Sequence, residues 1–212
     1  LRFMPSDLNI EQYTSQFADL DSERPLQLLA DWVQEAKDLG MAEPDAMNLA
    51  TVDEKGNPHN RMVLMRHITE REIGFFTNLN SSKAADIFAT QRTSCTLWWP
   101  QLERQVRIEG TAAEMPRNIV EDYFQSRPRN SQIAAWASKQ STELTSMERL
   151  HEEFRQFELK FSDKIVPTPT FWGGFTIHVD KIEYWHGKPF RLHERVILTK
   201  EDNNWSTTRI YP

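Results

Sequence analysis

Side chains able to bind an anion gather at two places in the sequence, near the expected ends of strands and helices. Arg61 and Arg66 bracket an apolar stretch, and Ser81, Ser82 and Lys83 follow a polar turn. Backbone N–H groups at a helix start, with hydroxyls and a lysine, can hold a phosphate. The alternatives that require no ligand are a serine N-cap and a solvent-exposed arginine on a strand. Each stretch on its own favours the alternative without a ligand.

Three more candidates are spaced four residues apart: Tyr123, Arg127 and Ser131. Pro128 interrupts the helix on which they would lie, so they need not form one stripe. They could still converge at the broken helix end. A phenol, a guanidinium and a hydroxyl brought together there would form a strong anion site.

A third group alternates along the chain near the C-terminus. Arg191, His193 and Arg195 share one face if this stretch is a strand. Three cationic or near-cationic groups on one face repel one another unless an anion or an electron-rich ring lies there. This pattern is therefore the hardest of the three to explain without a ligand.

Other classes of site find little support. The sequence contains neither dinucleotide nor P-loop glycine motifs, and neither a GxSxG elbow nor HExxH. Its single cysteine, Cys95, excludes an intramolecular disulfide and a thiolate metal cluster. The net charge of −6 opposes general binding to nucleic acid or an anionic membrane. We expect no nucleic-acid partner, no membrane partner and no metal.

The elements that must position these residues follow from periodicity and turn residues. Helical spacing and helix-ending residues predict helices over 25–40, 83–90, 116–126, 131–138 and 145–162. Alternating patterns predict strands over 46–52, 60–68, 72–77, 93–99, 104–115, 173–185, 195–199 and 205–210. The first three strands should form an antiparallel meander, because their links are too short for a parallel crossover.

Together these elements predict a mainly β protein with helical excursions (α+β), built as a closed or half-closed antiparallel barrel. We expect residues 24–212 to form a single domain and residues 1–23 to form a mobile N-terminal arm. No apolar run approaches the roughly 20 residues of a membrane span, and residues 1–7 lack the layout of a secretory signal. The expected location is the cytoplasm.

With these residues in view, the sequence from about residue 25 to 212 resembles the pyridoxamine 5′-phosphate oxidase family. The stretches that carry the resemblance are RMVLMR (61–66), FTNLNSSK (76–83), ERQV (103–106), YFQSRPRNSQI (123–133), WASKQS (136–141), FWGG (171–174), IEYW (182–185), RLHER (191–195) and RIYP (209–212). The resemblance implies an antiparallel FMN-binding split barrel. It also implies an obligate homodimer that binds two FMN molecules at the subunit interface.

The resemblance further implies roles for individual residues. Those implied to bind the FMN cofactor are Arg61, Met62, Val63, Leu64, Met65, Arg66, Phe76, Thr77, Ser82, Lys83, Gln105, Gln140, Ser141, Trp185 and Arg195. Those implied to bind the substrate are Arg66, Tyr123, Arg127, Ser131, Arg191 and His193. Arg191 and His193 are the implied catalytic pair, which orients the pyridine ring and supplies charge.

The implied reaction is the FMN-dependent oxidation of pyridoxamine or pyridoxine 5′-phosphate to pyridoxal 5′-phosphate. A hydride moves from C4′ to flavin N5, and dioxygen is reduced to hydrogen peroxide. Two alternatives stay open: another FMN split-barrel oxidase or reductase acting on a phenazine-like ring, and a non-catalytic flavin- or vitamin B6-binding protein. The anion site at Tyr123, Arg127 and Ser131 argues against a substrate without phosphate.

The sequence departs from the family pattern at three places. Arg66 stands where the family usually has lysine, which keeps the charge but changes the reach. Ser82 stands where an arginine is usual, so one cation near the FMN phosphate is missing. The N-terminal arm lacks the usual arginine before a tyrosine, for which Tyr13 is a gapped match.

Overall fold

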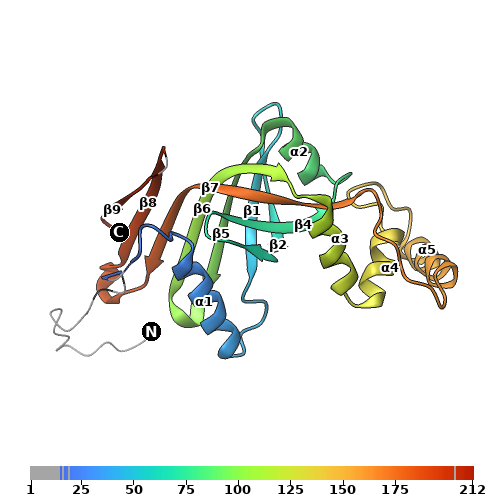
Figure 1. The fold of residues 1–212 in the computed structure, drawn as a ribbon, viewed down its shortest axis with the longest axis horizontal. Helices are drawn as coiled ribbons and strands as arrows, with labels where there is room; N and C mark the ends of the chain where they lie inside the picture. The colour runs from blue at the N-terminus through green and yellow to red at the C-terminus, as the bar shows by residue number, and fades with distance from the viewer. Residues whose placement is uncertain (1–14, 16, 19, 203) are drawn as a thin grey trace.

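The computed structural model describes residues 15, 17–18, 20–202 and 204–212 (Figure 1). Tyr13 and most of the expected N-terminal arm lie outside these residues. The arm departs from expectation at Phe17, which is only 3% exposed and packs against Trp32 and Tyr184, with ring centroids 6.2 and 6.3 Å apart. At this point the chain is part of the hydrophobic core.

The described residues form one curled, antiparallel, nine-stranded sheet. Its strands are β1 (Ala46–Val52), β2 (Pro58–Leu64), β3 (His67–Ile68), β4 (Glu72–Asn78), β5 (Arg92–Trp99), β6 (Arg104–Glu114), β7 (Trp172–His186), β8 (Glu194–Glu201) and β9 (Asn204–Arg209). The main path runs β2-β1-β5-β6-β7-β4-β3, and β8 and β9 extend from the far part of β7. Because β2 and β3 are consecutive in the chain yet end the path on opposite sides, the sheet must curl into a partial barrel.

The prediction of one strand over 60–68 is wrong, because this stretch is divided between β2 and β3. The backbone N–H of Met65 donates to Asp45 O at 2.8 Å, whereas that of Arg66 donates to Gly74 O at 2.9 Å. The chain therefore leaves the β1 edge at these two residues and joins β4 through β3. The predicted antiparallel pairing is confirmed, but β2 pairs with β1 and the separate strand β3 pairs with β4 at the other end of the sheet, so the simple meander is not formed.

The long strand β6 bends, as its length predicts. Its register with β7 shifts between Glu109 and Gly110. A Cβ atom added at Gly110 would lie 2.2 Å from the backbone oxygen of His178, so the close approach of the two strands requires glycine here.

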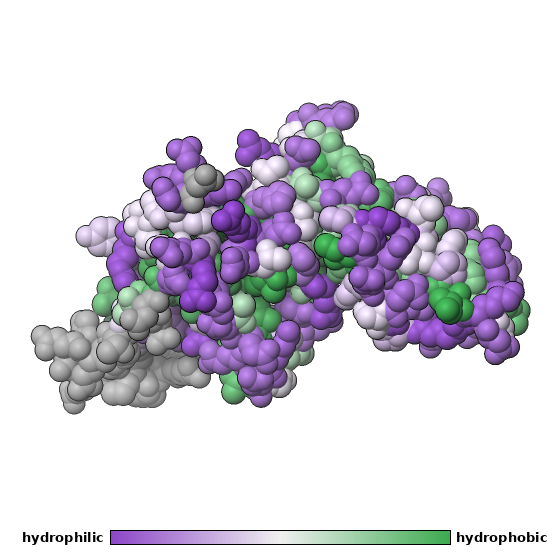
Figure 2. All heavy atoms as spheres, viewed as in Figure 1, coloured by the Kyte–Doolittle hydropathy of each residue, from purple (hydrophilic) through white to green (hydrophobic). Residues whose placement is uncertain are grey.

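Alternation decides which side chains fill the barrel. Met47, Leu49 and Thr51 of β1 are buried, as their period of two predicts. Helix α1 (Gln27–Asp38) covers this core and buries Trp32 and its apolar neighbours. Figure 2 shows a mostly hydrophilic face in the orientation of Figure 1, with small hydrophobic patches.

The remaining helices match the predicted segments within a few residues: α2 (Ser82–Thr90), α3 (Arg117–Ser126), α4 (Arg129–Ala137) and α5 (Met147–Lys160). Figure 1 shows α3, α4 and α5 together beyond one end of the sheet. They build a second, smaller apolar cluster around Phe124, Ile133 and Trp172. No helix in the described residues is long and apolar enough to cross a membrane.

Candidate active site

A cavity of about 410 Å³ lies where β2 and β4 meet α3, α4 and the start of α2. Its volume falls in the range of small-molecule sites. The predicted site residues that line it are Met62, Val63, Leu64, Arg66, Phe76, Thr77, Lys83, Tyr123, Arg127, Ser131 and Gln140. Residues far apart in the sequence, expected to serve one cofactor and one substrate, therefore share a single cavity.

The break between α3 and α4 brings Tyr123, Arg127 and Ser131 to one wall of this cavity, as predicted. The Arg127 guanidinium lies over the Trp172 ring, 4.9 Å from its centroid. Its Nη1 is buried and has no hydrogen-bond partner among the described residues. Burial lowers the pKa of Arg127, and the Tyr123 phenol partly opposes that shift. A buried guanidinium that still has a hydrogen bond to donate is a site for an anion.

Trp172 was missed as a site residue in the sequence. It lines the cavity, and its ring is nearly parallel to that of Phe76, at 5.5 Å between centroids and 2° between planes. The FWGG stretch, which carries part of the family resemblance, was the available signal.

Lys83 supplies a second cation on another wall. Its Nζ donates to Thr77 Oγ1 at 3.1 Å, Ser81 Oγ at 3.2 Å and Gln140 Oε1 at 2.9 Å, all on neutral side chains. Burial, reinforced by the nearby charge of Arg61, lowers the pKa of Lys83 to about 8. The ammonium group is therefore positioned by neutral oxygen atoms and would gain from an added negative charge.

Arg61 does not line the cavity. Its Nη1 donates to Leu49 O at 3.2 Å and to Thr51 Oγ1 at 2.8 Å, and its Nη2 lies 3.8 Å from Asp86 Oδ2. The buried Asp86 also accepts a hydrogen bond from Thr51 Oγ1 at 2.6 Å and contacts His59 Nδ1 at 3.1 Å. Arg61 thus contacts β1 and α2. The hydrogen-bond network that it forms with Thr51 and Asp86 was not indicated by any sequence pattern.

Arg66 lines the cavity and pairs with the buried carboxylate of Asp45. Ser82 is exposed in the first turn of α2, and the N-cap position belongs to Ser81, which makes no side-chain capping hydrogen bond. The structure therefore does not support Ser82 as the helix cap. Met65 and Ser141 also lie outside the cavity lining.

A second group of predicted residues gathers on β6, β7 and β8. Trp185 pairs with Gln105 on one side and with Arg195 on the other, and its ring lies 4.7 Å from that of His193. His193 Nδ1 accepts a hydrogen bond from the Lys188 backbone N–H at 3.0 Å, so a neutral ring carries its proton on Nε2.

The prediction of one strand face for residues 191, 193 and 195 is wrong. Arg191 lies in a tight 3-10 turn, Pro189–Arg191, and β8 begins only at Glu194. Phe190 and Arg191 have φ values of 58° and 62°, a left-handed conformation that interrupts the alternation. Arg191 is exposed at this turn.

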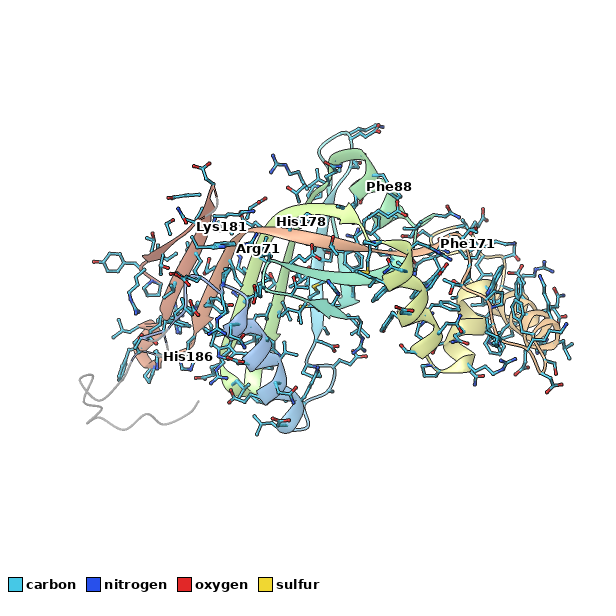
Figure 3. All side chains as sticks on the ribbon, in the orientation of Figure 1. Arg71, Phe88, Phe171, His178, Lys181 and His186 are labelled. Carbon is cyan, nitrogen blue, oxygen red and sulfur yellow. The ribbon has the colours of Figure 1, made fainter. Side chains whose placement is uncertain are left out.

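The cavity and the second group lie apart within one chain. Trp172 and Trp185 sit near opposite ends of the 15-residue strand β7, which is roughly 50 Å of chain at about 3.3 Å per residue. Phe171 just before β7 and His186 at its end, both labelled in Figure 3, lie on opposite sides of the molecule. A single chain therefore does not unite all the predicted residues.

Comparison with known proteins defines the class. The structure matches PhzG from Burkholderia lata, solved in complex with tetrahydrophenazine-1-carboxylic acid, with a TM-score of 0.88 and 26% identity over 94% of this chain and 98% of that one. It also matches the fold of a pyridoxamine 5′-phosphate oxidase-related, FMN binding protein from Nostoc punctiforme, with a TM-score of 0.72 and 17% identity over 89% and 98% of the two chains. The protein is an antiparallel split barrel, and the predicted fold class is confirmed.

Sequence comparison narrows the class. Residues 33–161 match the pyridoxamine 5′-phosphate oxidase family, and residues 172–212 match the pyridoxine 5′-phosphate oxidase C-terminal dimerisation region. Two proteins named pyridoxine/pyridoxamine 5′-phosphate oxidase are similar: one from Leptospira biflexa, 41% identical over 89% of both chains, and one from Aliivibrio fischeri, 43% identical over 92% of both. The chain belongs to the pyridoxamine 5′-phosphate oxidase family, and the prediction of an oxidoreductase of this family is confirmed.

Proposed function

We propose that the protein oxidises pyridoxamine 5′-phosphate or pyridoxine 5′-phosphate to pyridoxal 5′-phosphate, with FMN as its cofactor. The observation that carries the proposal is the buried Arg127 Nη1, which has no partner among the described residues and lies in a cavity beside Tyr123 and Ser131. A phosphate oxygen there would complete the hydrogen bonding of the guanidinium.

The donors of the cavity fit a flavin phosphate as well as a substrate phosphate. Lys83 lies at the start of α2, where backbone N–H groups and the helix dipole favour negative charge. It comes from α2, whereas Arg127 lies at the break between α3 and α4, so a cofactor phosphate and a substrate phosphate could each have a cation of its own. A bound FMN would supply a two-electron acceptor for the C4′ hydride and a route for those electrons to dioxygen, which becomes hydrogen peroxide. From pyridoxamine 5′-phosphate the product is an imine, and water would convert it to the aldehyde and release ammonia.

We infer that the site is completed in a homodimer, with Gln105, Trp185 and Arg195 of the partner subunit contacting the cofactor. The match of residues 172–212 to a dimerisation region supports this arrangement. So do Met62 and Trp98, which are 61% and 49% exposed, because large apolar side chains at such exposure often mark subunit interfaces.

In this arrangement, Arg191 and His193 of the partner subunit would hold the pyridine ring against the flavin. His193 would present Nε2–H, because its Nδ1 is already occupied by the Lys188 backbone. Neither residue is required to act as a nucleophile. Their part is to orient the ring and to stabilise charge.

A second candidate is an oxidase or reductase of a phenazine-like ring, which the likeness to PhzG favours. A carboxylate on such a ring could also pair with the Arg127 guanidinium. The first candidate is favoured by the higher sequence identity, 41% and 43% to the two oxidases compared with 26% to PhzG. A third candidate is a flavin- or vitamin B6-binding protein without turnover.

One assay separates the first candidate from the other two. The purified protein, expected to be yellow, is mixed with pyridoxamine 5′-phosphate, and pyridoxal 5′-phosphate and hydrogen peroxide are measured. Pyridoxamine without phosphate is the matched control and should react far more slowly. A yellow protein that makes neither product from either phosphorylated substrate would refute the proposal.

A further inference from the structure

A row of alternating charges crosses β6, β7 and β8 on the face that also carries Trp185. Lys181 Nζ lies 3.3 Å from Glu109 Oε1, and Arg107 Nη2 lies 3.9 Å from the same oxygen. Arg107 Nη1 is 3.1 Å from Glu183 Oε2, and Arg195 Nε is 2.8 Å from Glu183 Oε1. The row therefore ends at Arg195, which the proposed function places against the cofactor.

Glu183 differs from the other carboxylate of the row in its burial and its contacts. Its side chain is 7% exposed, compared with 46% for Glu109, and each of its two oxygen atoms is occupied by a different arginine. A buried carboxylate keeps its charge at low cost only when both oxygens are paired in this way. Its geometry is therefore more closely defined than that of an exposed ion pair.

The contact at Arg195 is made through Nε, and Nη1 donates to Tyr211 O at 3.1 Å. Two bonds on different nitrogens restrict the rotation of the guanidinium about its side chain. The hydrogen bond to Glu183 also raises the pKa of Arg195. Because residue 183 is two positions before Trp185, both side chains lie on the same face of β7.

We propose that Glu183 is a positioning residue for the cofactor: it holds the Arg195 guanidinium in the orientation that meets FMN, and shares its charge with Arg107. This inference rests on the proposed function, since it assumes that Arg195 contacts FMN. Its physical basis is entropy, because an arginine already held in its bound geometry loses less freedom when the ligand arrives.

A role of Glu183 through its charge alone and a role in positioning Arg195 predict opposite effects of Glu183→Gln on FMN binding. If Glu183 acted only through its negative charge, its removal would tighten the binding of an anionic cofactor. If it positions Arg195, Glu183→Gln should weaken FMN binding roughly 5- to 10-fold, because one amide oxygen cannot hold two arginines. Glu183→Asp keeps the charge but shortens the reach, and should also weaken binding.

The experiment measures the release of FMN from the holoprotein by flavin fluorescence. The variants are Glu183→Gln, Glu183→Asp, Arg195→Ala and the double variant that combines Glu183→Gln with Arg195→Ala. If Glu183 acts through Arg195, Glu183→Gln adds nothing in the Arg195→Ala background. The visible absorption band of the bound flavin should shift alike in Glu183→Gln and Arg195→Ala. Glu109→Gln, on the same row but without a contact to Arg195, is the matched control and should bind FMN as the unaltered protein does.

The outcomes separate the inference from the function on which it rests. Arg195→Ala with unaltered FMN binding would remove Arg195 from the cofactor site, and with it this inference. Arg195→Ala with weakened binding, beside Glu183 variants that bind normally or more tightly, would overturn the inference alone. Additive losses in the double variant would do the same. If Glu183→Gln fails to fold, Glu183→Asp carries the test.

Discussion

Arg127→Ala removes a cation that lines the cavity and has no ion-pair partner among the described residues. In the folded protein Arg127 Nη1 is buried and unpaired among the described residues, so a bound phosphate adds charged hydrogen bonds where none exists before. Such a bond contributes about 1.5–3 kcal/mol, more than a neutral one. Water entering the emptied space would donate some of the hydrogen bonds that the phosphate loses. The total loss of binding free energy should therefore stay near the energy of one charged hydrogen bond.

We therefore expect Arg127→Ala to weaken binding of the phosphorylated substrate by about 1.5–3 kcal/mol, or roughly 10- to 150-fold in Kd. FMN content should stay near normal, because Lys83 lies on another wall of the cavity. Arg127→Lys should fall between the two proteins, since it keeps the charge but loses the planar fork that stacks on Trp172.

The assay is substrate binding under anaerobic conditions, followed by the flavin absorbance, with FMN content measured on the same samples. The comparison with pyridoxamine lacking phosphate is the internal control, and its weak binding should not change. A variant that loses FMN yet keeps its affinity for the phosphorylated substrate would refute the assignment of Arg127.

Three further predictions concern the cofactor and the ring. In the protein without ligand the pKa of Lys83 is about 8, and a bound phosphate would raise it, so FMN binding should take up a proton and weaken as the pH rises above 8. The equilibrium affinity for FMN, measured from pH 7 to 9.5, should therefore fall with pH, and a flat profile in that window would exclude Lys83. Replacing Arg191 or His193 with alanine should lower kcat as well as affinity, whereas an unchanged kcat in both variants would place them outside the site. Ser82→Arg should tighten FMN binding several-fold at low salt and less at high salt. Since Ser82 is exposed and does not occupy the N-cap position, Tm should change little; looser FMN binding would contradict the electrostatic reasoning.

The sequence by itself determined most of the elements and indicated that one group of candidate residues would meet. The alternation of Met47, Leu49 and Thr51 predicted a strand with one buried face, which the structure shows. The spacing of Tyr123, Arg127 and Ser131 around a proline indicated a convergence that the cavity contains. These are short-range features, in which period, turn residues and helix breakers act within a few residues of one another.

Only the tertiary structure decided the features that depend on distant partners. The chain leaves β2 at Met65 because the Asp45 carbonyl and the β4 edge offer backbone bonds there. Arg61 faces Asp86, a carboxylate far along the chain whose place beside it depends on how α2 packs on β1. Local periodicity contains no information on such pairings.

The separation of the two halves of the site is of the same kind. The alternation of Arg191, His193 and Arg195 could not show that Arg191 lies in a turn before β8. The turn arises because Phe190 and Arg191 adopt a left-handed backbone conformation, which side-chain periodicity does not reveal. Alternation predicted a strand with Trp172 and Trp185 near its two ends, but it could not show which residues of other elements lie beside each of them. Which residues meet around one ligand follows from long-range strand pairing and, in the proposed homodimer, from the assembly of two chains, because both bring together groups that share no stretch of sequence.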